Sequence, residues 1–382
     1  MRFIHTADWH LGKLFHGRHL TEDQSHVLAQ LIELVRHERP DAVLVAGDLY
    51  DRAVPPPEAV RLLDHALSEI VLGAGVPVVL IAGNHDSPDR LAFGSRLLAA
   101  QGLHVFGAAA GEIGWVPVRD AAGLVHVYAV PYAEPAAVRT ALGVEGVDSH
   151  QAAMDACVTR VRGAHPAGER SVLVGHTFVT GGAESESERP LAVGGVASVN
   201  ASSFGGFSYV ALGHLHRPQA LDGGRVRYSG SLLKYSFDEA SHRKAASVVE
   251  IGADGTAVVE EIPLIPRHDV REVRGVLAEL IREPVGPVDD YLAFVLEDEG
   301  PLVDATGQLR AVYPNVLHHR KALAQAPERA PRAVGNHRTV REEEVFPHFF
   351  LDVTDMEISP PHMGAFTRTL ERMRAEEREG VA

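Results

Sequence analysis

The sequence predicts an α/β fold in which amphipathic helices pack on layers of buried strands. Four short apolar runs, rich in Val, Ile or Leu and bounded by Gly, have the length of buried strands; they are residues 42–46, 76–82, 172–174 and 209–212. Helical stripes lie between them: one comprises Leu28, Leu31, Ile32 and Val35, and another, after the prolines at 55–57, comprises Val60, Leu63, Leu67 and Ile70. Alternation of such strands and helices is typical of an α/β layered core.

The rest of the chain divides at changes of pattern. A helix is expected at 149–162 behind a Ser149 cap, and the strands expected at 225–229, 245–251 and 256–264 end near Pro266. Residues beyond them show a strand, helix, strand, helix and strand, then a Pro- and Gly-containing stretch with linker composition, then two helical patterns (340–357 and 362–379) divided by Pro360 and Pro361. We therefore expect a main domain at 1–265, a small α/β capping domain at 266–321, a linker at 322–339 and C-terminal helices at 340–382.

Composition limits the classes of protein that fit. The 382 residues are 45% hydrophobic and 23% charged, which excludes disorder throughout. No stretch approaches the roughly 18 apolar residues of a membrane span, and the N-terminus lacks a signal-peptide pattern, so we expect a cytoplasmic protein without membrane contact. The single cysteine, Cys157, excludes an internal disulfide and a cysteine-based metal site. A net charge of -15 disfavours DNA binding by this chain alone.

Five short motifs place polar side chains directly after apolar runs: Asp8-Trp9-His10, Gly47-Asp48, Gly83-Asn84-His85-Asp86, Gly175-His176 and Gly213-His214-Leu215-His216. Their carboxylate, amide and imidazole groups are ligands that divalent cations accept. The candidate metal ligands are Asp8, His10, Asp48, Asn84, His176, His214 and His216. One Gly-His pair would be weak evidence, but the ordered set predicts a two-metal site that hydrolyses phosphate esters.

The spacing of these residues suggests which of them bind a metal and which face the substrate. Asp8 and His10, two residues apart in an extended segment, would point toward one metal, and the two oxygens of Asp48 could bridge cations about 3.5 to 4 Å apart. His85 is left free to face the substrate as a proton donor. Asp86 could accept a hydrogen bond from His85 and fix its tautomer, or it could equally cap the turn that follows. The pair at 214 and 216 could serve one metal or two.

At this point the sequence resembles the calcineurin-like metallophosphoesterase superfamily and, more narrowly, the SbcD family of nuclease subunits. Four strings carry the narrower resemblance, and the last two hold no candidate ligand: HTADWHLG at 5–12, GDLYDR at 47–52, ESESERP at 184–190, and YSGS at 228–231 leading to SFDE at 236–239.

The resemblance implies a two-sheet β-sandwich flanked by helices, followed by a capping domain and C-terminal helices. One metal would take Asp8, His10, Asp48 and His216, and the other Asp48, Asn84, His176 and His214. Manganese is the expected metal. Phosphates of DNA would contact Lys13, Arg18, Arg52 and Arg90, although some relatives have a histidine where this chain has Arg52.

The resemblance also implies an activity and partners. The expected reactions are 3′-to-5′ exonuclease action on double-stranded ends and endonuclease action on hairpins or single strands, in DNA repair, recombination and replication. The expected partner is the coiled-coil ATPase SbcC, bound by the helices at 340–379 through apolar residues, in a heterotetramer that contains a homodimer of this chain. Those apolar residues are Val345, Phe346, Phe349, Phe350 and Leu351. This chain has no Gly-rich nucleotide-binding loop of its own, so ATP dependence would come from SbcC.

Two alternatives remain open from the sequence. A stand-alone phosphatase or cyclic-nucleotide phosphodiesterase would use the same five motifs. A DNA-end scaffold with an inert site is disfavoured, because every expected ligand is present. Cleavage of a DNA hairpin compared with a chromogenic phosphomonoester would separate the enzymatic alternatives.

Overall fold

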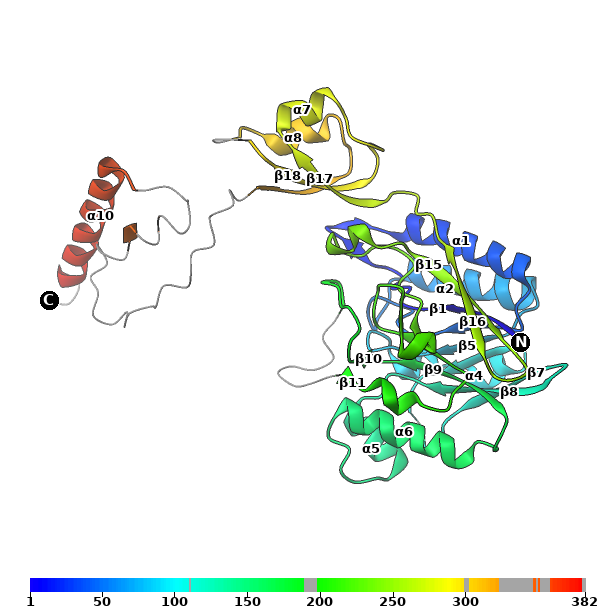
Figure 1. Ribbon diagram of the computed structural model, residues 1–382. Helices are drawn as coiled ribbons and strands as arrows, with labels where there is room; N and C mark the ends of the chain where they lie inside the picture. Colours follow the sequence, from blue (N-terminus) through cyan, green and yellow to red (C-terminus); the bar gives the residue numbers. More distant parts are fainter. Residues whose placement is uncertain are drawn as a thin grey trace.

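Two six-stranded β-sheets, packed face to face, form the centre of the computed structural model (Figure 1). The structure describes residues 1–109, 111–188, 198–298, 302–322, 346–347, 350 and 358–379. Within these, the first sheet has the order β16 (Ala257–Pro263), β15 (Ala245–Ile251), β1 (Arg2–Thr6), β4 (Ala42–Val45), β5 (Val78–Ile81) and β6 (Leu103–Phe106). The second has the order β13 (Gln219–Leu221), β14 (Val226–Tyr228), β12 (Tyr209–Gly213), β9 (Arg170–His176), β8 (Gly123–Val130) and β7 (Trp115–Asp120).

Helices cover the outer face of each sheet. The first sheet carries α1 (Thr21–Glu38) and α2 (Pro57–Ser68), and the second carries α5 (Pro135–Leu142) and α6 (His150–Ala164) (Figure 1). Strand β4 shows why this arrangement needs apolar residues on both strand faces: Leu44 points into the core between the sheets, whereas Val43 and Val45 pack in the core beneath the helices. The strands expected at 42–46, 76–82, 172–174 and 209–212 are thus confirmed.

Some details differ from the sequence prediction. Val60 is 43% exposed, and the buried face of α2 is instead formed by Ala59, Leu62, Leu63 and Ala66. The chain then continues into a π-helix, η1 (Glu69–Gly73), where Ile70 is buried. The hairpin of β7 and β8 at the edge of the second sheet was not predicted.

Short elements connect these layers. They are β2 (Leu14–Phe15), β3 (Arg18–His19), α3 (Pro88–Leu91), α4 (Ser95–Ala99), β10 (Phe178–Val179), β11 (Ser198–Val199), η2 (Ala201–Phe204), η3 (Asp222–Gly224) and η4 (Asp238–Ser241).

Parallel pairing of the strands determines where the residues that follow each strand lie. In the first sheet β1, β4, β5 and β6 are mutually parallel, and in the second β8, β9, β12 and β14 are parallel. The carboxyl ends of parallel strands meet at one edge of a sheet, where ligand sites form in many α/β proteins. The residues after β1, β4, β5, β9 and β12 therefore share one edge of the sandwich.

A separate three-stranded parallel sheet forms a small α/β unit after the sandwich. It comprises β17 (Val270–Gly275), β18 (Tyr291–Leu296) and β19 (Val316–Lys321), with α7 (Leu277–Arg282) and α8 (Ala305–Arg310) packed on it (Figure 1). We call it the capping sheet. Its attachment to the sandwich centres on Asp23 of α1, which accepts hydrogen bonds from the Tyr291 hydroxyl at 2.9 Å and from His268 at 2.8 Å.

The C-terminal part of the chain is described over a long helix, α10 (Pro360–Glu379). It begins two residues before the expected start, because prolines fit the first helical turn, where no internal N–H donor is needed. Phe346 stacks on Phe366 of α10 with ring centroids 3.7 Å apart. Val345, Phe349 and Leu351, and the expected linker except Ala322, lie outside the described residues. Of the helices described, none is long and apolar enough to cross a membrane.

Candidate metal centre

Five strand ends bring the seven candidate ligands together at one edge of the sandwich. The loops after β1 and β4 run side by side, because Asp8 N–H donates to the Gly47 carbonyl at 3.0 Å and His10 N–H donates to the Asp48 carbonyl at 2.9 Å. From the second sheet, His214 N–H donates to the Asp8 carboxylate at 3.0 Å. Backbone hydrogen bonds therefore hold the loops of both sheets in one fixed cluster.

The backbone at this edge is strained where it presents side chains. Four of the candidate ligands have positive φ angles: 53° at Asp8, 44° at His10, 51° at Asp48 and 104° at His214. Such angles cost free energy of order 1–3 kcal/mol each in residues with a side chain, and they concentrate at functional sites. The surrounding hydrogen bonds hold them in place.

Glycines make room for the ligands. A Cβ atom on Gly47, whose φ is 91°, would lie 2.4 Å from His176 Nδ1, and a Cβ on Gly83 would lie 2.1 Å from an Asp48 carboxylate oxygen. Any side chain at these two positions would displace a candidate ligand. Steric crowding thus explains why glycine precedes the polar residue in these two motifs.

One group of ligands consists of Asp8, His10 and His216, whose ligand atoms lie within 4.8 Å of one another. The Nε2 atoms of His10 and His216 are 3.1 Å apart, and His10 Nε2 is 3.8 Å from Asp48 Oδ2. These are the residues that the resemblance assigns to one metal.

A second group surrounds His176. Its Nε2 lies 3.4 Å from Asp48 Oδ2 and 2.9 Å from Asn84 Oδ1, and His214 Nδ1 lies 3.3 Å from the same Asn84 oxygen. Asp48 therefore lies between the two groups, as a bridging carboxylate requires. Asp8, Asp48 and His176 also form a compact set of ligand atoms.

Burial leaves the charges of this cluster poorly compensated. Asp8, His10, Asp48, His176 and His216 are at most 2% exposed. Desolvation raises the pKa of Asp8 and lowers the pKa of His10 and His216. Burial opposes ionisation of Asp48 and His176, but the attraction between the two opposite charges is stronger. This attraction lowers the pKa of Asp48 and raises the pKa of His176 to about 9.

These residues fit a pair of divalent cations. The donor set mixes carboxylate, amide oxygen and imidazole, and buried His10 Nδ1 has no hydrogen-bond partner within the described part of the chain. Apart from His176, whose charge is paired with Asp48, burial favours the neutral form of the imidazoles, so two cations would supply the positive charge that the cluster lacks.

His85 lies beside the cluster, with its ring centroid 4.7 Å from that of His10. Its backbone N–H donates to Asp48 Oδ1 at 2.8 Å, and its Nδ1 is 2.8 Å from the Asp51 carbonyl, which accepts its proton. Because a carbonyl oxygen only accepts, this contact makes Nδ1 the donor and leaves Nε2 as the other ring nitrogen. Asp51, which sequence reasoning did not select, thereby orients His85.

Of the two roles left open for Asp86, a hydrogen bond from His85 is not among the contacts of its carboxylate in the described part of the chain. Asp86 instead accepts the backbone N–H groups of Gly83, Leu49 and Tyr50 at 3.0 to 3.1 Å, so it ties the loop after β5 to the loop after β4. Burial, followed by the charge of Asp48, raises the pKa of Asp86 to about 6. The carboxylate therefore joins the two loops, and neither role left open by the sequence matches these contacts, because none of the three donors lies in the turn that follows Asp86.

The four expected DNA-contacting residues occupy different surroundings. Lys13 pairs with Asp51 at 2.9 Å and lies over the Tyr235 ring. Arg18 reaches the Pro314 carbonyl at 3.5 Å, next to the capping sheet. Arg52 is exposed in the loop that follows Asp48, and Arg90 is exposed on the short helix α3 that follows Asp86.

A groove of about 800 Å³ adjoins the cluster between the sandwich and the capping sheet. On the sandwich side it is lined by Phe15, His16, Ser187 and Tyr235, and Tyr235 packs edge-on against His10 at 5.5 Å. His318 lines the opposite side, from β19. The groove therefore leads from the candidate ligands along the capping sheet.

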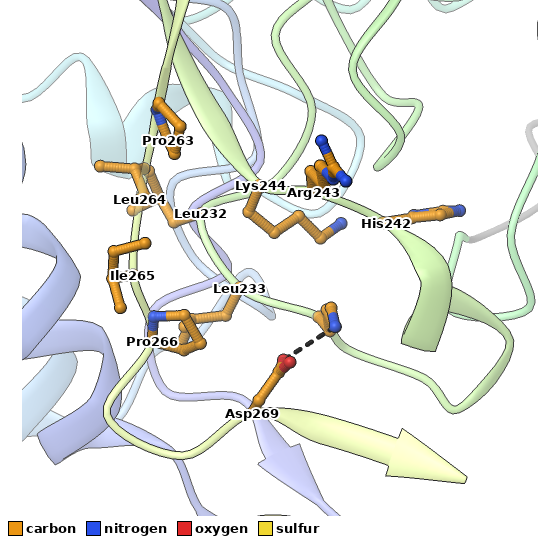
Figure 2. Close-up of a pocket in the computed structure, with 11 residues that line it drawn as sticks. Leu232, Leu233, His242, Arg243, Lys244, Pro263, Leu264, Ile265, Pro266 and Asp269 are labelled. Atoms are coloured by element: carbon orange, nitrogen blue, oxygen red, sulfur yellow. Dashed lines mark ion pairs between the residues drawn. The ribbon is translucent and has the colours of Figure 1, made fainter.

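A second, mainly apolar pocket lies at the junction of β16 and β17 (Figure 2). Leu233, Leu264 and Ile265 line it, and the ion pair between Lys234 and Asp269, 2.8 Å long, stands at its border. None of the seven candidate ligands is among its lining residues. Lys244 lines it as well, although its ammonium group is directed to the back of the metal cluster.

Comparisons with known proteins agree with this geometry. The family model for calcineurin-like phosphoesterases matches residues 1–218, and the model described as a type 5 capsule protein repressor C-terminal domain matches residues 266–354. The chain is 30% identical over 366 residues to the SbcD subunit of the SbcCD nuclease from Staphylococcus epidermidis, covering 94% of this chain and 95% of that protein. The chain therefore belongs to the calcineurin-like phosphoesterases and, within them, to the SbcD family of nuclease subunits.

Solved structures with a similar arrangement are more distant. The protein TT1561 of Thermus thermophilus is 13% identical with a TM-score of 0.40, over 68% of this chain and 98% of that one. A dimetal phosphatase from Danio rerio is 14% identical with a TM-score of 0.38, over 69% of this chain and 96% of that one. The predicted family is confirmed by the family model and the curated relative, and the predicted two-sheet fold is confirmed by the strand order of the structure.

Proposed function

We propose that this protein is a metal-dependent DNA nuclease that hydrolyses phosphodiester bonds as a subunit of an SbcC-containing complex. The observation that carries the proposal is the convergence of seven oxygen and imidazole ligands from five strand ends, with Asp48 between the two groups. Family membership favours this function over the stand-alone phosphatase.

The proposed ligand sets are Asp8, His10, Asp48 and His216 for one cation, and Asp48, Asn84, His176 and His214 for the other. We propose manganese, which accepts this mixture of oxygen and imidazole ligands. When bound, the cations polarise the phosphate and make water a stronger nucleophile at neutral pH. The protein's own groups would hold the ions, and the Asp51 carbonyl orients His85.

His85 is the proposed proton donor to the leaving oxygen. The Asp51 carbonyl holds Nδ1, so Nε2 is the atom directed toward a phosphodiester. His85→Ala should lower the cleavage rate by roughly 10²- to 10⁴-fold, the usual contribution of such a group, while both metal ions stay bound. Full activity in this variant would remove His85 from the mechanism.

The test of the main proposal is a cleavage assay of the purified protein loaded with Mn²⁺. The protein, with and without SbcC, is given a DNA hairpin, a blunt duplex labelled at one end, and a chromogenic phosphomonoester. Cleavage of the hairpin and 3′-to-5′ shortening of the duplex are expected. Turnover of the monoester alone would favour the phosphatase.

DNA is proposed to approach along the groove beside the capping sheet and to contact Lys13, Arg18, Arg52 and Arg90. Exposure of Arg52 and Arg90 near the cluster supports this assignment. Replacing both with Gln should weaken DNA binding without changing metal content, and should make the dependence of affinity on salt less steep. An unchanged salt dependence would place the phosphate contacts elsewhere.

SbcC is the proposed partner of the segment at 340–379. The aromatic contacts of Phe346 with Phe366, and of Phe350 with His362, support an apolar docking element at α10. A chain that ends at Arg338 should no longer co-purify with SbcC. Retained co-purification would contradict the assignment.

We further propose that two copies associate within this complex and that it acts in the cytoplasm. Phe93 and Leu97, which are 86% and 79% exposed beside α3 and α4, offer an apolar contact close to the loop of His85. Phe93→Glu should shift the protein from dimer to monomer in light scattering. A wild-type monomer would contradict the homodimer.

A further inference from the structure

Two segments that contain no candidate metal ligand meet behind His216. Ser187, from the loop before residue 189, lies 2.6 Å from His216 Nδ1, and Glu239 of η4 lies 3.3 Å from the same nitrogen. The Ser187 hydroxyl donates to Glu239. Ser187 belongs to the string at 184–190 and Glu239 to the string at 236–239, the two strings of the family resemblance that hold no candidate ligand. Both therefore contact the imidazole of His216.

The backbone of His216 is held by the same network. Its N–H donates to Glu188 at 2.6 Å, and its carbonyl accepts a hydrogen bond from the Lys244 ammonium at 2.7 Å. Lys244 also donates to Glu239 and to Ser231. Glu239 is fully buried and Lys244 is 5% exposed, so bulk water does not compete for these contacts.

This chain of contacts determines which ring nitrogen faces the metal cluster. Ser187 donates its proton to Glu239, so its oxygen accepts the proton on His216 Nδ1. Nε2 then carries the lone pair, and it is the nitrogen 3.1 Å from His10 Nε2. Carboxylates that hold the second nitrogen of a histidine ligand commonly set its tautomer and its orientation.

Lys244 allows a carboxylate to remain ionised there. The Lys244 ammonium lies 2.5 Å from Glu239 Oε2, so the carboxylate has an opposite charge beside it at this depth. An unpaired charge at this depth would be strongly destabilising.

We propose that Glu239 is a positioning residue for the metal centre: acting through Ser187, it directs His216 Nε2 toward one cation, while Lys244 balances its charge. The inference rests on the proposed metal ligands. It assigns a role to Glu239 and Lys244, which belong to neither proposed ligand set.

The test measures Mn²⁺ binding to the full-length protein by equilibrium dialysis and by electron paramagnetic resonance. Glu239→Gln should weaken the site of Asp8, His10 and His216 by about 10- to 100-fold, the usual effect of removing such a partner, and leave the other site unchanged. At intermediate Mn²⁺ concentration the spectrum should then be that of an isolated ion, whereas the wild type shows an exchange-coupled pair. Glu261→Gln, an equivalent change on the exposed face of β16, should show the wild-type result.

A double variant separates positioning from a merely structural role. Glu239→Gln leaves Lys244 as an uncompensated buried charge, so the melting temperature should fall; Glu239→Gln with Lys244→Met should restore it but keep the weakened site. Recovery of both stability and Mn²⁺ affinity in the double variant would overturn the inference. Ser187→Ala, which leaves the ion pair intact, should weaken the same site without lowering the melting temperature, and unchanged affinity there would also overturn the inference.

Mn²⁺ binding to the wild-type protein distinguishes failure of this inference from failure of the proposed function. A wild-type protein that binds no pair of Mn²⁺ ions would overturn the metal centre itself. A wild type that binds the pair, together with Glu239→Gln binding it equally well, would overturn only the role of Glu239.

Discussion

The metal edge of the sandwich and the capping sheet use polar residues in opposite ways. At the metal edge, the ionisable groups of Asp8, Asp48 and His176 are buried, and the backbone adopts positive φ at four candidate ligands. In the capping sheet the core is apolar, and the positive φ of Asp304 belongs to a helix cap whose side chain accepts the Gly307 N–H. The capping sheet has the features of a stable fold, whereas the metal edge retains buried titratable groups beyond the pair of Asp48 and His176, which bound cations would compensate.

The largest expected effect comes from Asp48, because it lies between both ligand groups. Asp48→Asn should abolish binding of the ion pair and reduce cleavage to background, since a neutral amide cannot bridge two cations as a carboxylate does. Metal analysis after dialysis against Mn²⁺, with a hairpin cleavage assay, measures this.

Asp290 provides the matched change in the capping unit. It is 6% exposed and accepts hydrogen bonds from Asp269 N–H at 2.8 Å and Arg271 Nε at 2.6 Å. Asp290→Asn should lower stability and leave Mn²⁺ content unchanged. If the two variants behaved alike, the contrast between the two regions would be lost.

A smaller effect is expected from pH. His176 has a pKa raised to about 9 by Asp48 against the opposing effect of burial, so in the metal-free protein it is protonated at neutral pH. A proton must leave before the nitrogen can bind a cation, so Mn²⁺ affinity should rise by up to roughly tenfold per pH unit below pH 9 and then level off. The raised pKa of buried Asp8 acts in the same direction.

Isothermal titration calorimetry in two buffers with different ionisation enthalpies would count the protons released by Mn²⁺ binding. At least one proton per chain is expected at neutral pH. Metal binding without proton release would show that the pair of Asp48 and His176 is already deprotonated.

The smallest effect concerns the attachment of the capping sheet. The Tyr291 hydroxyl donates to Asp23 across the junction at 2.9 Å. Tyr291→Phe should lower the free energy of unfolding by about 1.5 to 3 kcal/mol, the typical value for a hydrogen bond to a charged group, with no change in Mn²⁺ affinity. Urea denaturation measures it, and wild-type stability would mean that the junction is held by its apolar contacts alone.

The sequence predicted the candidate ligands better than the residues that hold those ligands in place. Each candidate ligand follows an apolar strand, so strand pattern and residue type together were sufficient to select all seven. The role of Asp86 was left open, because a carboxylate at that position can meet either an imidazole or backbone N–H groups. The β7 and β8 hairpin was missed, because Pro117 and Arg119 interrupt the apolar pattern at the sheet edge.

Residues that orient a histidine of the site, without being candidate ligands themselves, could not be recognised from the local sequence pattern. Asp51 uses its backbone carbonyl to orient His85, so its side-chain type is not informative. Glu239 and Lys244 are charged residues that a sequence places on the surface, and only the folded chain buries them together beside His216.

The most direct test of the metal centre is anomalous diffraction from crystals of this protein grown with Mn²⁺. Two peaks about 3.5 to 4 Å apart are expected, with Asp48 between them and His216 and His176 on opposite ions. A single peak, or manganese bound away from these residues, would contradict the proposed two-metal site.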